Sequence, residues 1–208
     1  MKITEPKIFK CVEKDLLTAY KENNFSDSIF ESNINENIKF TGITFDSCVF
    51  KNIDFQNVEL ENVDLVDVVF ENCDLSNKIF DQKCIRRVIF KNCKMIGISF
   101  IETSITDVQF INSIAKYINF SQAKIKNLIV KQSDFSEMSF MDTKVKDIDL
   151  DETNFSRSEI FKTSLREVDF STCNINGIMI DLFSLQGIII DRIQSEDLVG
   201  VLGVKFKD

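Results

Sequence analysis

The chain has 208 residues, a length that fits one domain or one long array of repeats. Apolar residues make up 44% and charged residues 28%, a balance that supports a buried core and excludes intrinsic disorder. There is no histidine, which excludes His-based acid–base catalysis, His ligation of metals and Ser–His or Cys–His nucleophile pairs. The formal net charge of −8 is, by itself, no more than many proteins need for solubility.

Residues 1–21 are predicted to form an N-terminal cap. Ile8, Val12, Leu16 and Tyr20 recur at roughly helical spacing, so we expect a short helix or an irregular cap over residues 7–22. The opening stretch MKITEPKIFKC has no apolar signal-peptide core, and no apolar run in the chain is long enough to span a bilayer. We therefore expect a cytoplasmic protein with no membrane contact, in which the six cysteines are reduced.

An apolar residue recurs at every fifth position through most of the chain. Stepping by five from Phe25 to Ile190 meets an apolar side chain at each step except Asn35. This period matches neither the 3.6-residue period of a helix nor the two-residue period of a strand. A second column of small or β-branched residues lies two positions earlier, as Val68 does before Phe70. Each group of five therefore directs two side chains inward and three, mostly polar, outward.

The segments FENCDLSNKIF and VDFSTCNI resemble the consensus of the pentapeptide-repeat proteins, a central Leu or Phe with a small residue two positions before it. The resemblance implies an all-β solenoid, a right-handed quadrilateral β-helix in which each group of five forms one face. We expect it over residues 22–192. Stacked coils bury a column of large side chains that one repeat cannot bury alone. At about 4.8 Å between coils, the rod would be roughly 40 Å tall.

Two lysines interrupt the small inward column, Lys78 and Lys83 in SNKIFDQKCIRR. Because a buried unpaired ammonium group is costly, we expect a local bulge here with the ammonium groups directed outward. A simple irregularity and a functional departure from the repeat are both open as explanations.

Two further sets of residues are predicted to be structural. One set consists of stacked amides that can hydrogen-bond along the rod, namely Asn52, Asn72, Asn92 and Asn112. The other consists of cysteines in the small inward column that act as apolar filler, namely Cys48, Cys73, Cys93 and Cys173.

The five-residue pattern stops after Ile190, and residues 193–208 are predicted to be a C-terminal helix and strand. In SEDLVGVLGVKF we expect a helix with Ser195 as its N-cap and Gly203 as its stop, then a strand at Val204–Phe206. The predicted helix has an apolar face, and the predicted strand has no partner in its own coil. A second copy of the chain could cover both in a two-fold interface. We predict a homodimer through Leu198, Val201, Leu202, Val204 and Phe206.

Among the pentapeptide-repeat proteins, the chain resembles the quinolone-resistance and gyrase-binding subset. CDLSNKIF…VIFKNCKMIGISF follows the general run of that subset, and LQGIIIDRIQSEDLVGVLGVKF resembles its C-terminal end, which forms a dimer. The resemblance implies a DNA mimic that occupies the DNA site of DNA gyrase or topoisomerase IV and protects it from quinolones or peptide toxins. Acidic side chains repeating along the rod would partly match the field of DNA. The predicted partner-binding residues are Glu59, Glu61, Asp81, Glu102, Asp142, Asp149, Asp151 and Asp169.

Other functions are open or excluded to different degrees. The unbroken register shows no long loop of the kind that protective members often carry, so a scaffold module with an unknown partner is the alternative. A face with Arg86, Lys124, Lys126 and Lys144 could contact nucleic acid, but the acidic net charge and the lack of interleaved aromatic residues disfavour direct binding. No P-loop, G-x-G-x-x-G motif or nucleophile–base pair is present, which predicts a protein without enzymatic activity, cofactor or metal.

Overall fold

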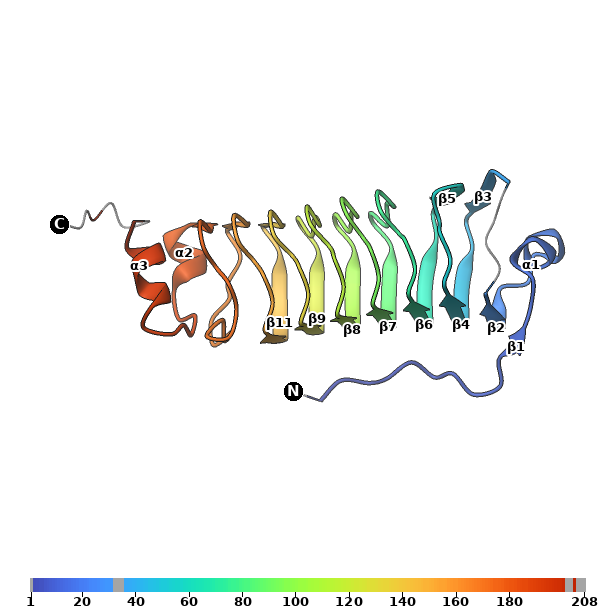
Figure 1. The fold of residues 1–208 in the computed structure, drawn as a ribbon, viewed down its shortest axis with the longest axis horizontal. Helices are drawn as coiled ribbons and strands as arrows, with labels where there is room; N and C mark the ends of the chain where they lie inside the picture. The colour runs from blue at the N-terminus through green and yellow to red at the C-terminus, as the bar shows by residue number, and fades with distance from the viewer. Residues whose placement is uncertain (1, 32–35, 201–203, 205–208) are drawn as a thin grey trace.

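The structure is a computed structural model that describes residues 2–31, 36–200 and 204. Figure 1 shows a rod of stacked coils that runs from α1 at one end to α3 at the other. The helices are α1 (Leu16–Glu22), α2 (Leu182–Leu185) and α3 (Gln194–Val199). The strands are β1 (Val12–Glu13), β2 (Ser26–Phe30), β3 (Ile38–Thr41), β4 (Thr44–Lys51), β5 (Val58–Glu61), β6 (Asp64–Glu71), β7 (Cys84–Lys91), β8 (Ser104–Ile111), β9 (Lys124–Lys131), β10 (Ser139–Met141), β11 (Lys144–Asp151), β12 (Glu159–Phe161) and β13 (Met179–Ile180). Within the described residues, no helix has the length and apolar character needed to cross a membrane.

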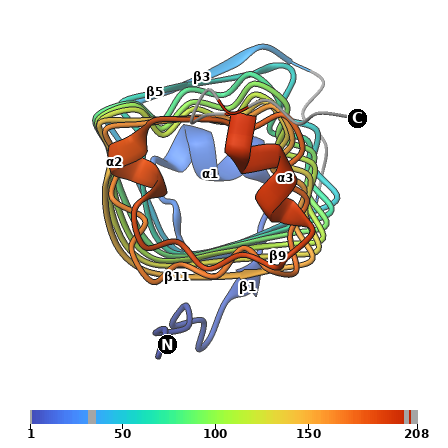
Figure 2. The same cartoon turned by 90° about the vertical axis from the view of Figure 1, so that its left-hand side faces the viewer.

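Successive coils pair in parallel at a fixed offset. Phe50 lies opposite Phe70 and Phe70 opposite Phe90, and side chains in line along the rod are 20 residues apart. The largest sheet has eight strands in the order β1-β2-β4-β6-β7-β8-β9-β11, and smaller sheets contain β10-β12-β13 and β3-β5. Seen along the axis, the coils superimpose as a four-sided outline (Figure 2). The right-handed quadrilateral β-helix predicted from the period of five is confirmed.

The apolar residues at every fifth position fill the inside of the rod. The rings of Phe70 and Phe90 stack with centroids 5.2 Å apart, and those of Phe90 and Phe110 with centroids 4.9 Å apart. The largest fully buried side chains all come from this column: Phe30, Phe40, Phe45, Phe50, Phe55, Phe70, Phe80, Phe90, Phe100, Phe110, Phe120 and Phe135. The core is therefore one continuous stack along the rod axis.

The corners of the coils explain part of the polar sequence between these residues. The residue two positions after the buried centre has a positive φ, as Asn72 does after Phe70 with φ 55°. Asn and Asp tolerate this left-handed conformation better than most residues do. At Gly97, where φ is 69°, an added Cβ would lie 2.8 Å from Oδ1 of Asn77 in the preceding coil. That close approach calls for glycine at this corner.

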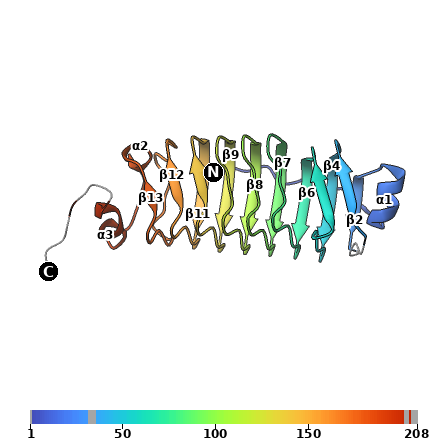
Figure 3. The ribbon, with the colours of Figure 1, turned by 90° about the horizontal axis from the view of Figure 1, so that it is seen from above.

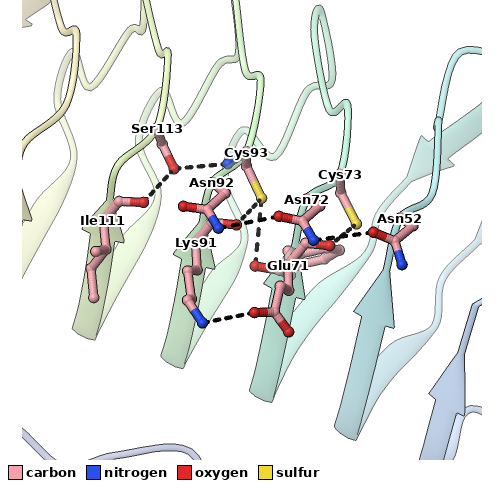
Figure 4. A network of polar contacts seen from close by, with 10 residues as sticks. Asn52, Glu71, Asn72, Cys73, Lys91, Asn92, Cys93, Ile111 and Ser113 are labelled. Carbon is pink, nitrogen blue, oxygen red and sulfur yellow. Dashed lines mark hydrogen bonds and ion pairs between the residues drawn. The ribbon is translucent and has the colours of Figure 1, made fainter.

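A ladder of amides links neighbouring coils on the outside of the eight-stranded sheet (Figure 4). Nδ2 of Asn72 donates to Oδ1 of Asn52 at 3.1 Å, and Nδ2 of Asn92 donates to Oδ1 of Asn72 at 3.2 Å. Beside it, Nζ of Lys91 lies 2.7 Å from Oε1 of Glu71. The structural role predicted for these three asparagines is confirmed.

The four cysteines of the inward column are buried, which confirms that they act as small filler. Sγ of Cys93 donates to the carbonyl of Phe70 at 3.5 Å (Figure 4). Burial raises the pKa of Cys48 to about 12, so its thiol stays protonated at neutral pH. All six cysteines are free thiols in the structure, and Cys84 is exposed.

The N-terminal helix is shorter than the spacing predicts. It begins at Leu16 because the Asp15 carboxylate caps it, accepting the backbone N–H of Thr18 at 2.9 Å. Of the two forms expected for residues 7–22, the helix is found at Leu16–Glu22, and Ile8 and Val12 lie outside it. Val12 lies in β1, which pairs with β2 and covers the edge that the first coil would otherwise expose.

Residues 2–11 run along the outside of the eight-stranded sheet (Figure 1). The backbone N–H of Lys7 donates to Oδ1 of Asp67 at 2.9 Å, and Nε2 of Gln109 donates to Oε1 of Glu5 at 2.9 Å. Asp67 also forms an ion pair with Arg87. Asp67 and Gln109 are consequently buried, although their positions in the repeat face outward.

The last coil carries α2 and α3 at the end of the rod (Figures 1 and 2). The prediction of Ser195 as the N-cap is wrong, since α3 begins at Gln194 and Oγ of Ser195 donates to the carbonyl of Arg192 at 2.6 Å. Nε2 of Gln194 donates to the carbonyls of Phe170 and Cys173, at 2.9 and 2.6 Å. These two bonds fix the start of α3 onto the preceding coil, which sets where the helix begins.

The remaining C-terminal predictions fall mostly outside the described residues. Val201, Leu202, Gly203 and Phe206 lie there, and with them most of the predicted strand. Val204 is described; it is exposed and belongs to no strand.

Candidate protein-interaction site

The eight acidic residues proposed from the sequence fall into two groups on different faces. Five follow the column that begins with β5, and three lie at β11 and its continuation. The first group is Glu59, Glu61, Asp81, Glu102 and Asp142, and the second is Asp149, Asp151 and Asp169. The register places the two groups apart around the rod, so the structure does not bring all eight together.

The carboxylates of the first group are bonded to neighbouring coils. Nζ of Lys39 lies 2.8 Å from Oε1 of Glu59 and 3.3 Å from Oε2 of Glu61, and hydrogen bonding to these carboxylates raises the pKa of Lys39. Oδ1 of Asp81 accepts the backbone N–H of Ile101 at 2.9 Å. These side chains are exposed or half-buried, so water screens their pairs strongly and their charges remain accessible to a partner.

The backbone ladder is interrupted between β5 and the coil that follows it. β5 pairs with β3 on one side, and the two form a sheet of their own. Twenty residues further on, Ile79 bridges onward to Ser99 instead of back to Glu59. Within the described residues, β5 therefore has a free edge facing residues 77–83. We call the space between them the β5 gap.

Lys78 and Lys83, the two lysines that break the inward column, lie in the β5 gap. Nζ of Lys78 donates to the backbone carbonyl of Val58 at 2.7 Å, and Nζ of Lys83 donates to Oδ1 of Asn62 at 2.7 Å. The predicted bulge is wrong, since residues 76–83 keep the turn pattern of the later coils and the irregularity is the missing pairing with β5. The predicted outward direction is also wrong for Lys78, whose ammonium group is half-buried and bonds to the preceding coil.

The β5 gap contains a pocket of about 340 Å³. Pockets that hold small ligands measure about 300–1,000 Å³, so this one has room for a few side chains. The lining combines the free strand edge, three carboxylates and two ammonium groups: Val58, Glu59, Leu60, Glu61, Asn62, Asn77, Lys78, Ile79, Asp81 and Lys83.

A second interruption follows β11, the last strand of the eight-stranded sheet. Register would place Asp147 beside Glu167 and Asp149 beside Asp169, but within the described residues β11 pairs only with β9. The inward residues of β11 are consequently only half-buried: Val145, Ile148 and Leu150.

The C-terminal end of the rod exposes apolar side chains that the repeat pattern did not predict as a surface. Leu182 and Phe183 of α2 are 64% and 59% exposed, and Ile193, just before α3, is 81% exposed. Leu198, by contrast, is 5% exposed and packs in the core. Leu198 therefore contributes to the cap of the last coil, and its role in dimerisation stays a prediction.

Comparison with known proteins agrees with this architecture. A family model described as "Pentapeptide repeat region" matches residues 63–129 and 104–180, and one described as "Pentapeptide repeats (9 copies)" matches residues 36–77. A search of curated proteins found no match.

Several solved structures align along most of the chain. A trypsin-treated form of QnrB1, described as a plasmid-mediated fluoroquinolone resistance protein, is 18% identical, with 85% of this chain and 99% of that chain covered and a TM-score of 0.38. HetL, involved in heterocyst differentiation regulation in the cyanobacterium Nostoc sp. strain PCC 7120, is 14% identical, with 84% and 95% covered and a TM-score of 0.37. Rfr23 of the cyanobacterium Cyanothece 51142 is 13% identical, with 85% and 97% covered and a TM-score of 0.22.

Proposed function

Because the chain belongs to the pentapeptide-repeat family, we propose that it is a rod-shaped binding protein that mimics DNA. We propose further that it acts in the cytoplasm and has no enzymatic activity. Its partner is a type II topoisomerase, DNA gyrase or topoisomerase IV, and it occupies the DNA site of that enzyme. The consequence for the cell is protection from quinolones or from peptide toxins that act on the same enzyme.

The observation that supports this proposal most directly is the acidic column on the β5 face. Glu61, Asp81, Glu102 and Asp142 follow one another along the rod in successive or alternate coils. Each coil adds about 4.8 Å of length, over which duplex DNA carries about three charges. The column supplies between none and two carboxylates per coil, so it matches part of the charge density of DNA, and the shape of the rod has to supply the rest of the recognition.

The same proposal includes a homodimer through the C-terminal end. Leu182, Phe183 and Ile193 are exposed at this end of the rod, and exposed apolar side chains are a feature of protein interfaces. Eight strands at about 4.8 Å spacing span about 34 Å. The coils that follow β11 lengthen the rod further, so two rods end to end would span at least about 70 Å, the length of about 20 base pairs at 3.4 Å each.

The test is a gyrase supercoiling assay together with a duplex DNA binding assay on the same purified protein. Inhibition of supercoiling without binding to DNA supports the mimic. A matched variant with Glu61→Lys and Asp81→Lys should inhibit less while the oligomeric state is unchanged. If the wild-type protein leaves gyrase active at high micromolar concentration, the proposal is wrong.

An interaction scaffold with another partner is the second candidate. The observation that favours it is the balanced charge of the surface, where Lys39 offsets Glu59 and Glu61 and Lys94 offsets Asp74 at 2.8 Å. A dimeric protein that leaves gyrase untouched would support this candidate over the mimic.

A further inference from the structure

We propose that the β5 gap is a docking site for an extended peptide segment that carries a carboxylate side chain. The peptide backbone would add to the free edge of β5, on the side opposite β3. Its carboxylate would bind the ammonium groups of Lys78 and Lys83. This inference does not rest on the proposed action on a topoisomerase, because it concerns the lysines and the strand edge of the β5 face, whereas that proposal concerns the carboxylates of the same face.

The strand edge supplies the first half of the site. A strand with one unpaired edge is a template for another extended chain, and peptide recognition by strand addition uses such edges. In the later coils of this face the next coil fills this position, as the coil of Ser99 does for Ile79. At β5 that position is unfilled by the described residues, and the edge opens into a pocket of about 340 Å³.

The two lysines supply the second half. Their ammonium groups bond to uncharged oxygens, the carbonyl of Val58 and the amide of Asn62. Among the ion pairs of the described residues, none contains Lys78 or Lys83. A carboxylate adds the attraction between opposite charges, which a neutral oxygen cannot supply, so an acidic peptide side chain would displace the present partners.

The carboxylates around the gap are bonded elsewhere and leave the lysines available. Glu59 and Glu61 bond to Lys39 on the β3 side, and Asp81 bonds to the following coil. Burial lowers the pKa of Lys78, although the more distant charges of Asp54, Asp74 and Glu59 act in the opposite direction. An incoming carboxylate would offset the cost of this desolvation, since it would pair directly with the ammonium group.

The repeat itself shows that these lysines are not needed for folding. The column of Lys78 holds Val58, Ile98 and Ile118 in other coils, all of them buried. Lys83 stands in the column of Thr103, whose Oγ1 donates to the carbonyl of Phe80 at 2.6 Å. The substitutions Lys78→Ile and Lys83→Thr would restore both columns, and we expect them to close the gap and stabilise the fold.

Disulfide tethering to Cys84 provides the experiment. Cys84 is exposed and directly follows Lys83. In the full chain with Cys11→Ser, the equilibrium yield of mixed disulfide under 2-mercaptoethanol is measured by intact mass spectrometry. The probes are the synthetic peptide amides Cys-Thr-Val-Glu-Val-Thr, the same peptide with Lys in place of Glu, and the same peptide with Pro in place of each Val. We expect about tenfold stronger retention of the Glu peptide than of either control peptide, the effect of one charge-assisted hydrogen bond.

The variants decide what the preference means. Lys78→Ile with Lys83→Thr should abolish the preference and raise the urea midpoint, and Lys78→Gln with Lys83→Gln should abolish it without closing the gap. Lys126→Thr, on another face, should leave it unchanged. Equal retention of the Glu and Lys peptides would overturn the proposal. So would retention of the Pro peptide at the level of the Glu peptide, which would indicate a simple anion site, and so would a preference that survives loss of both lysines.

Discussion

Replacing Phe90 by Ala tests whether the central stack holds the rod together. Phe90 is fully buried, and its ring stacks on Phe70 at 5.2 Å and on Phe110 at 4.9 Å. Parallel pairing of β7 with β6 and β8 fixes the distance between coils, so the neighbouring rings cannot collapse into the space that the substitution leaves. Truncation of a buried Phe to Ala costs about 3–5 kcal/mol in the free energy of unfolding. The ring also makes an edge contact with Phe100, and the three lost ring contacts, each worth about 0.5–1.5 kcal/mol, place the expected value in the upper half of that range.

The assay is urea unfolding followed by circular dichroism, with the slope compared between variants to confirm that the same surface is exposed. Phe9→Ala is the matched control, because Phe9 is 82% exposed and its loss should change stability by less than about 0.5 kcal/mol. A loss below about 1 kcal/mol for Phe90→Ala, with an unchanged slope, would refute the reasoning that the stack is rigid and continuous.

Three further predictions concern thiols, pH and assembly. With a thiol reagent, the exposed Cys84 should react within the mixing period, whereas the buried Cys93 should react only at the rate of unfolding; equal rates would contradict the burial of the inward column. Burial alone would raise the pKa of Asp67, but hydrogen bonds from Arg87 and from the N-terminal segment lower it below its usual value. The stability that depends on this carboxylate should therefore be complete above about pH 4 and be lost as pH falls through the lowered folded pKa. The difference in unfolding free energy between wild type and Asp67→Asn should shrink over that range, and a constant difference would argue against the ion pair. Light scattering should show a dimer for the wild type and a monomer for Phe183→Glu, and a wild-type monomer would contradict the proposed interface.

The part of the fold set by local repetition was predictable from the sequence. Phe70, Phe90 and Phe110 recur at the 20-residue period of the coil, so each one occupies the same place in its own coil. The buried columns predicted from this period are the ones observed. The amide ladder followed for the same reason, since residues 20 positions apart meet wherever the register holds.

The features that could not be predicted depend on contacts between residues that the repeat does not relate to each other. The N-terminal segment reaches Asp67 and Gln109 across 60 and 104 residues, and no periodic signal links such positions. Lys78 and Lys83 did mark the irregular coil, but the sequence alone could not decide between a bulge and a missing strand pair. The interruption after β11 had no such signal, since Asp149 and Asp169 repeat an acidic pair that Asp54 and Asp74 accommodate in a regular bridge.

An apolar side chain near the C-terminal end can either fill the core of the last coil or lie on the surface, and the sequence alone does not decide between the two. Leu198 has the apolar character of an interface residue, but the open last coil needs the same character and buries it. Phe183 lies in the stretch that the period of five assigned to the solenoid. That pattern gave no sign that the residue would be exposed on α2.

The register of 20 residues per coil has a consequence for how such a rod can change over evolutionary time. Figure 3 shows the coils following one another along a straight axis, so a residue's sequence number fixes both its height and its direction around the rod. Duplicating or deleting one whole coil would move every later side chain along the axis without turning it, and would lengthen or shorten a binding surface that already exists. Duplicating or deleting a single group of five would preserve the core but turn all later side chains by a quarter of a revolution, so that Asn92 would no longer lie over Asn72. A small change in length can therefore redirect half of the surface toward a new partner while the buried stack stays intact.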